Sequence, residues 1–291
     1  MGRNSFGGSD DLEGRARREV PRLRFHGEKG LETGPARLVG DLWTILRSRS
    51  HISRRLPPMA ELLSRPPFPG FRPEAFAFLR ALAENNDRDW FKARKDTYEA
   101  ELKDPLELLL TDGARRLAET DLPLTAHPKK SRFRIHRDMR FTDDKTPYKT
   151  HVSGAFDRSG QRDESGVVYV HVEPDDCFLG AGFYQPSVPY LRPVRERIAA
   201  EPERFVELLD EMEARGLPVH SMEDTLTGMP KGFSDYRDTP IAPYLKWKNY
   251  VVKRDYPDDA LQSPDFAGEV VRMAQDVRPL LEFVWAGEPS S

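Results

Sequence analysis

The chain has 291 residues and a formal net charge of −3, with 38% hydrophobic and 32% charged residues. This composition is typical of a soluble globular protein. No apolar run approaches the roughly 20 residues of a membrane-spanning helix, and the N-terminus lacks the pattern of a secretory signal. The single cysteine excludes an internal disulfide and a cysteine-based zinc cluster. We therefore expect a cytoplasmic protein that does not bind membranes.

Residues 1–58 differ from the rest of the chain. They contain eleven arginines and one lysine against seven acidic residues, and they show no sustained apolar period. Such sequence cannot bury enough surface to offset the entropy lost on ordering. We expect a disordered basic extension, or translated sequence upstream of a true start at Met59, because organised sequence follows Met59 directly. The alternative is a basic arm that contacts nucleic acid or anionic lipid.

Three helices are predicted in the first part of the organised sequence. Their start signals are proline at the first helical position or an aspartate that caps the N-terminus. In chain order the helices begin at Pro73, at Asp87 or Asp89, and at Pro105, and Asn85-Asn86 ends the first.

The apolar period changes to two between Arg132 and Gln185, which predicts an antiparallel meander. Strands are expected over residues 133–142, 152–156, 168–172 and 178–184. Further helices are expected over 189–200, 202–215 and 264–284, with a short strand over 250–253. Helices that flank a run of strands indicate an α+β fold, with the sheet at about residues 132–185.

The sequence SRFRIHRDMRFTDDKTPYKT, residues 131–150, is the most distinctive in the chain. Residues 129–151 hold eight lysines and arginines against three aspartates. If residues 133–142 form a strand, Arg134 and Arg140 flank Asp138 on its polar face, while Arg137 falls on the apolar face. A buried guanidinium there needs a carboxylate, a bulge that redirects it, or a bound anion.

Arginine forks are suited to bidentate binding of phosphate or carboxylate, so the motif predicts an anion-binding site for a small molecule. The following turn brings its lysines and tyrosine close to the arginines. The predicted ligand-binding residues are Arg134, Arg137, Asp138, Arg140, Asp144, Lys145, Tyr148, Lys149 and, on a separate turn, Lys231. Two alternatives stay open. The patch could bind nucleic acid, which the acidic remainder of the chain disfavours, or it could be a purely structural network of salt bridges.

Four segments together resemble a known family. They are NNDRDWFKARKDTYE (85–99), RIHRDMRFTDDKTPYK (134–149), LGAGFYQPS (179–187) and PKGF (230–233). The chain resembles the bacterial and fungal domain-of-unknown-function family 2461 over about residues 71–286. The resemblance implies a single domain, over residues 68–288, and motifs that belong together. It implies no established activity, substrate or cofactor.

A second group of polar residues lies on the predicted strands and could form a metal site or an acid–base pair. Its members are His136, Asp138, His151, Tyr169, His171 and Glu173. No recognised metal-ligand spacing is present, so the sequence assigns no metal and no cofactor. It also lacks the G-x-S-x-G, P-loop and G-x-G-x-x-G motifs, and it identifies no catalytic residue. Whether the protein is an enzyme stays open at this stage.

Overall fold

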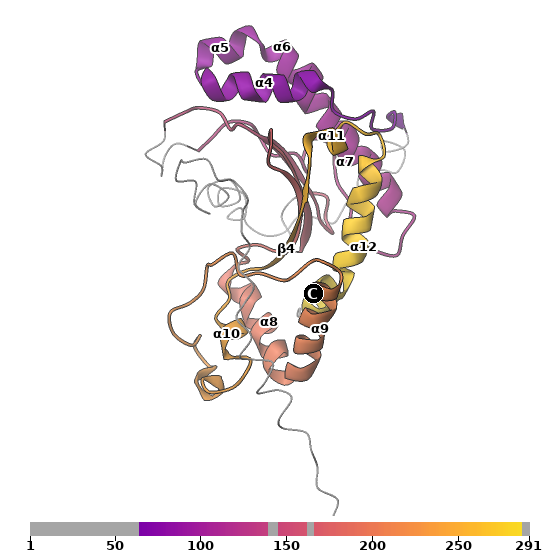
Figure 1. Cartoon of the computed structure of the whole chain (residues 1–291). Coiled ribbons are helices and arrows are strands. Elements are labelled where there is room, and N and C mark those ends of the chain that lie inside the picture. Colours follow the sequence, from indigo (N-terminus) through magenta and orange to yellow (C-terminus); the bar gives the residue numbers. More distant parts are fainter. Residues whose placement is uncertain (1–63, 139–144, 162–165, 287–291) are drawn as a thin grey trace, which may run out of the picture.

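The computed structural model describes residues 64–138, 145–161 and 166–286. A four-stranded antiparallel sheet of order β1-β2-β3-β4 lies at its centre. In chain order the strands are β1 (Val152–Phe156), β2 (Val167–Val172), β3 (Cys177–Phe183) and β4 (Tyr250–Tyr256). Helices α7 (Asp104–Leu117) and α12 (Phe266–Trp285) lie along one side of the sheet, and groups of shorter helices lie at its two ends (Figure 1). The predicted α+β class, with a meander flanked by helices, is confirmed.

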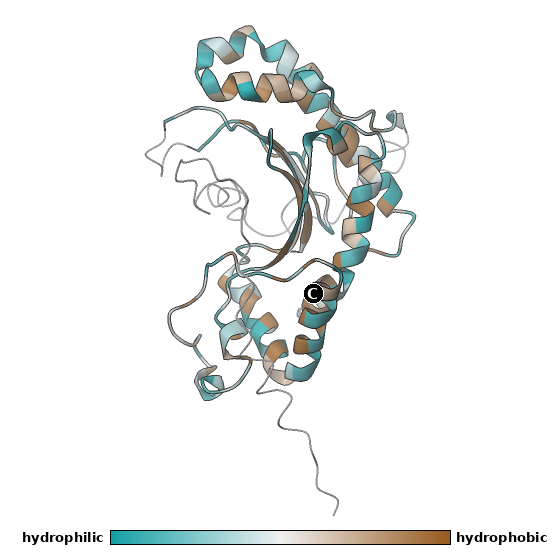
Figure 2. Ribbon diagram, in the orientation of Figure 1, coloured by the Kyte–Doolittle hydropathy of each residue, from teal (hydrophilic) through white to brown (hydrophobic). Residues whose placement is uncertain are grey.

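The alternating pattern of β2 divides the sheet into two faces. Val168, Val170 and Val172 are fully buried on the face that packs against the helices, whereas Tyr169 and His171 point to the opposite face. Both α7 and α12 mix hydrophobic and hydrophilic residues along their length (Figure 2), as expected for helices with one side on a sheet.

Glycine allows α7 to approach β1 closely. A Cβ atom at Gly113 would lie 2.6 Å from the ring of Phe156, and one at Gly154 would lie 2.9 Å from the side chain of Leu110. These contacts fix the helical layer against the first strand.

The N-terminal helical group begins with α4 (Pro73–Glu84), as predicted from Pro73 and the two asparagines. The group continues with α5 (Arg88–Ala93), α6 (Lys95–Tyr98) and a π-helical turn, η1 (Glu99–Lys103), which leads into α7. Asp87, rather than Asp89, caps α5, because its carboxylate accepts hydrogen bonds from the backbone N–H groups of Asp89 and Trp90.

The second group of helices joins β3 to β4 and comprises α8 (Val188–Ala200), α9 (Pro202–Ala214), the short η3 (Ser234–Tyr236) and α10 (Ala242–Leu245). The short helix α11 (Asp258–Leu261) follows β4 and lies at the other end of the sheet, where the N–H of Phe71 donates to the carbonyl of Leu261 (3.0 Å) (Figure 1). The predicted bounds of α8, α9 and α12 agree with these elements to within two residues. Among the described residues, no helix is long and apolar enough to cross a membrane.

The strand predicted over residues 133–142 is wrong over its described part, residues 133–138. Its backbone hydrogen bonds change partner and so build no continuous ladder. The N–H of Phe133 donates to Ser153 of β1 (2.8 Å), but the N–H of Arg137 donates to Pro147 (2.9 Å). We call residues 131–138 and 145–150 the basic arms; they run antiparallel, with an isolated bridge between His136 and Tyr148. The rest of that strand, and the predicted extension over residues 1–58, lie outside the described residues.

Candidate functional site

The loop between α4 and α5 holds the basic arms in place. Asn86 donates through Nδ2 to the carbonyl of Tyr148 (2.9 Å) and accepts through Oδ1 from its N–H (3.0 Å). The ring of Phe91 stacks on that of Tyr148, with centroids 4.1 Å apart. Residues that are 62 positions apart in the sequence therefore form one unit, within which Tyr148 is buried.

Positive charge gathers at the exposed side of this unit. Arg88 and Arg134 are both exposed, and neither forms an ion pair within the part of the chain that the structure describes. His136 lies on the same arm, beside the rings of Phe91 and Tyr148. Partial burial lowers the pKa of His136, and the charges of Arg134 and Arg88 lower it further. The lowered pKa of His136 thus indicates a positive electrostatic potential at this position.

Two further cations of the basic arms have partners within the fold. Arg137 is half-buried and donates from Nη1 to Oγ1 of Thr146 (2.7 Å), which gives it the polar contact that its position requires. Lys149 is buried, with its ammonium 5.9 Å from the centroid of the Phe133 ring. These two residues therefore contribute to the architecture of the arms.

The remaining predicted residues divide into three groups. Asp138 is half-buried and Lys145 exposed, each at the end of a described arm. Arg140 and Asp144 lie outside the described residues. Lys231 is exposed on the segment between α9 and η3, and this region lies near α8 and α10, at the end of the sheet opposite α4 and α5 (Figure 1). The fold therefore gives no support for Lys231 as part of the same site.

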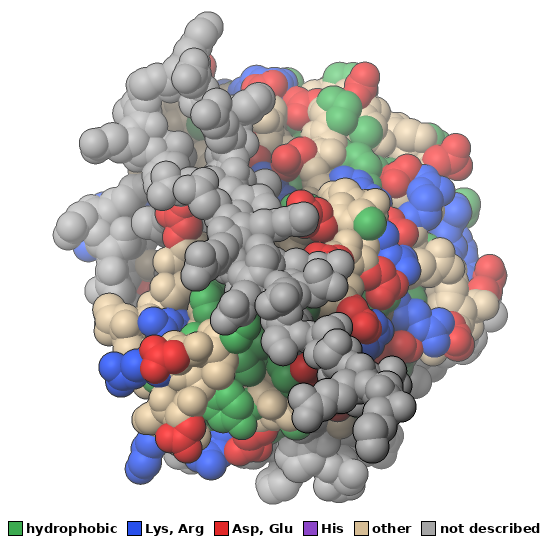
Figure 3. All heavy atoms as spheres, turned by 60° about the horizontal axis from the view of Figure 1, so that its bottom comes forward, with side chains coloured by type: hydrophobic (Ala, Val, Ile, Leu, Met, Phe, Trp, Pro, Cys, Tyr) green, Lys and Arg blue, Asp and Glu red, His purple; other side chains and the backbone are tan. Residues whose placement is uncertain are grey.

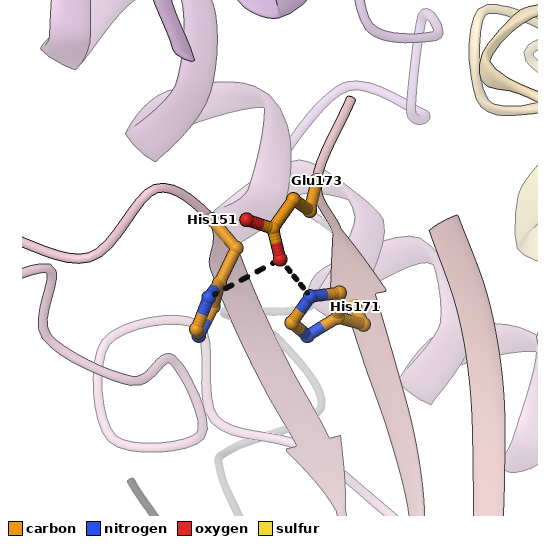
Figure 4. A group of neighbouring side chains, drawn as sticks. All are labelled: His151, His171 and Glu173. Atoms are coloured by element: carbon orange, nitrogen blue, oxygen red, sulfur yellow. Dashed lines mark hydrogen bonds and ion pairs between the residues drawn. The ribbon is translucent and has the colours of Figure 1, made fainter. Parts of the chain in front are cut away.

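A second cluster lies on the sheet face that α7 and α12 leave uncovered. His151, His171 and Glu173 converge there from the residue before β1, from β2 and from the residue after β2 (Figure 4). Oε2 of Glu173 lies 3.0 Å from Nε2 of His171 and 3.8 Å from Nδ1 of His151. The centroids of the two imidazole rings are 4.3 Å apart.

Surrounding groups fix both the orientation and the protonation of this cluster. The hydroxyl of Tyr169 lies 3.1 Å from Nδ1 of His171, and Thr150 donates to Oε1 of Glu173 (2.6 Å). Burial lowers the pKa of His171 to about 4, with a further contribution from His151, so the ring is neutral at pH 7.

Glu173 is ionised in the same cluster. Burial alone would raise the pKa of this carboxyl group, but hydrogen bonds from His171 and Thr150 and the neighbouring imidazoles outweigh it and lower the pKa to about 2. A neutral His171 then donates from Nε2 to Glu173 and accepts at Nδ1 from Tyr169.

The sequence analysis placed His151, His171 and Glu173 in a larger group of six polar residues but did not separate these three from the others. The signal that could have done so is the register of β1 and β2. Val152 pairs with Val172, so the antiparallel register places His151 opposite Glu173, one step beyond that pair. His136 and Asp138, which were predicted to join the same group, lie instead on the basic arm.

These features define a class of protein: an α+β domain whose antiparallel sheet is covered by helices on one face and carries a His–His–Glu cluster on the other. The domain also has a basic segment that is anchored by an asparagine and an aromatic stack. The chain belongs to the family described as Conserved hypothetical protein (DUF2461), whose model matches residues 74–283. No curated protein and no solved structure matches the chain.

Proposed function

We propose that the exposed side of the basic arms binds a small molecule through a phosphate or carboxylate group. The observation that carries this proposal is the state of Arg88 and Arg134. Both guanidinium groups are exposed, and in the described part of the chain neither has a carboxylate within ion-pair distance. Planar guanidinium groups bind such anions bidentately.

Most other arginines of the described chain are already neutralised. Arg72 pairs with Glu101, Arg132 with Glu107, and Arg278 with Asp121. The contrast argues against a salt-bridge network as the reason for the exposed arginines, because a network would bring a carboxylate to each of them. Asp138, Arg140, Asp144 and the lysines of the motif stay within the proposed site as candidates to orient or extend it.

A small ligand fits the charge distribution better than a nucleic acid does. Among the described residues on the face seen in Figure 3, acidic and basic side chains are mixed, without an extended region of one sign. Nonspecific binding to a phosphate backbone requires such a region, and the whole chain carries a net charge of −3. Binding to nucleic acid is therefore kept as an outcome of the test.

The test is a thermal-melt and calorimetric titration of the full chain with inorganic phosphate, adenosine monophosphate, citrate and a short oligonucleotide. A ligand at about 100 times its dissociation constant adds about 2.7 kcal/mol of stability, which raises the melting temperature by roughly 5–11 °C for a domain of this size. We expect Arg134→Ala and Arg88→Ala to abolish the shift. Arg237→Ala, which replaces an exposed arginine near η3, is the matched control.

Three results would reject the proposal. One is an equal shift in wild type and Arg134→Ala, which would place the anion elsewhere. Another is the absence of any shift, together with strong destabilisation of Arg134→Ala, which would favour a structural network. The third is binding of the oligonucleotide alone, with an affinity that falls steeply as salt increases, which would favour the nucleic-acid alternative.

A further inference from the structure

The geometry points to a second site: His151, His171 and Glu173 bind a divalent transition-metal ion on the sheet face opposite α7 and α12. This site shares no ligand residue with the proposed anion site and does not rest on it.

The donor atoms already lie at nearly the spacing that a metal ion requires. One donor atom from each residue lies within 4.8 Å of the others, and the two separations to Oε2 of Glu173 are 3.0 and 3.8 Å. Two ligands at about 2.0–2.1 Å from a tetrahedral zinc ion are about 3.3 Å apart. Small side-chain rotations therefore suffice to complete the coordination.

Within the described part of the chain, the carboxylate of Glu173 has no lysine or arginine within ion-pair distance. Among the described residues, the ion-pair partners of Glu173 are only His151 and His171. Lys253 on the neighbouring β4 pairs with Asp176 and Asp255 instead. A half-buried carboxylate beside a neutral imidazole favours a cation, and a metal ion needs both ligands in these deprotonated forms.

Outer groups hold two of the three ligands in a suitable orientation. Thr150 binds the carboxylate oxygen Oε1, which leaves Oε2 directed at the histidines. When Nε2 of His171 binds a metal ion, the ring proton is carried by Nδ1, and this N–H then donates a hydrogen bond to the Tyr169 oxygen, 3.1 Å away. His171 also stacks on Phe178, with centroids 4.6 Å apart, which fixes the ring plane. Such outer contacts are characteristic of metal sites.

Two imidazoles and one carboxylate are suited to Zn²⁺ or Fe²⁺. Three protein ligands leave at least one coordination position for water or a further ligand, as in metal sites that act as Lewis acids. The competing explanation is a metal-free hydrogen-bonded chain from Tyr169 through His171 to Glu173. That chain does not include His151, so His151 separates the two explanations.

The experiment measures binding of Zn²⁺, Fe²⁺ and Co²⁺ to the full chain after chelator treatment, by calorimetry and, for Co²⁺, by visible absorption. We expect one ion per chain. Glu173→Gln and His151→Gln should each weaken binding at least 10-fold and remove the Co²⁺ absorption bands. Thr150→Val, which removes only an outer contact, should weaken binding about 10–100-fold. His220→Gln, which replaces a buried histidine outside the cluster, should leave binding unchanged.

The proposal is overturned if the folded wild-type chain binds none of the three ions. It is also overturned if His151→Gln binds with the wild-type affinity and spectrum. Either result would leave the hydrogen-bonded chain as the explanation of the cluster. Circular dichroism of each variant establishes that it is folded. His151→Gln is the safest variant, since His151 lies outside the strands and takes no part in the hydrogen bonds that link Tyr169, His171 and Glu173. Phosphate binding by the basic arms is scored separately, so either site can fail alone.

Discussion

Replacing Asn86 by Ala should detach the basic arms from the α4–α5 loop and destabilise the domain. The amide of Asn86 makes two hydrogen bonds with the backbone of Tyr148, of 2.9 and 3.0 Å. Tyr148 is buried, so both of its backbone groups would lose a partner that water cannot easily replace.

The expected cost follows from these two bonds. A hydrogen bond contributes about 0.5–1.5 kcal/mol net, and an unpaired buried group costs about 1–3 kcal/mol. We therefore expect Asn86→Ala to lower the free energy of unfolding by about 2–3 kcal/mol. For a domain of this size, that corresponds to a fall of roughly 4–12 °C in melting temperature.

The neighbouring Asn85 provides a matched control for this measurement. The side chain of Asn85 donates to the carbonyl of Ala81 at the exposed end of α4 (2.9 Å), so Asn85→Ala should cost less than about 1 kcal/mol. Both variants are measured by thermal and urea denaturation. Equal losses in the two variants would refute the argument that Asn86 anchors the arms, as would a stable Asn86→Ala variant.

Three further predictions concern single residues. Gly182→Ala should lower the free energy of unfolding by at least about 3 kcal/mol or prevent folding, because Gly182 has φ +116° and the new Cβ would lie 2.2 Å from the carbonyl oxygen of Tyr250. Gly180→Ala is the control: its new Cβ would have its nearest contact at 3.6 Å, so the loss should be under about 1 kcal/mol. Similar losses for the two variants in urea denaturation would contradict this prediction. Cys177 should resist thiol reagents in native protein and react after unfolding, because burial and the nearby Asp258 raise its pKa to about 12; rapid native labelling would show the reasoning wrong. Burial lowers the pKa of His220. As the pH is lowered below about 6.5, the unfolded chain therefore takes up a proton before the native state does, and the stability decreases as the pH decreases. His220→Gln should flatten that dependence in melts at a series of pH values, and an unchanged slope would exclude this contribution.

The sequence alone determined the local elements of this protein. Proline at the start of α4, the asparagines that end it, and the Asp87 cap act within a few residues of the backbone they stabilise. The alternating valines of β2 likewise predict a strand with one buried face. These signals are short-range, so they can be identified before any tertiary contact is known.

Hydrogen-bond partners between distant segments were decided only by the tertiary structure. The alternation of residues 133–138 predicts a strand, yet this arm divides its backbone bonds between β1 and residues 147–149. Which face of the sheet is free of α7 and α12 is also decided by the tertiary structure, because it depends on where these two helices pack.

The His–His–Glu cluster shows the same division most clearly. The sequence supplies the three residues and places His171 and Glu173 on one side of a strand. Only the pairing of Val152 with Val172 brings His151 opposite Glu173. A strand's side-chain period follows from its own backbone, but its register depends on packing over the whole domain, and a shift of one residue would turn these side chains to the other face.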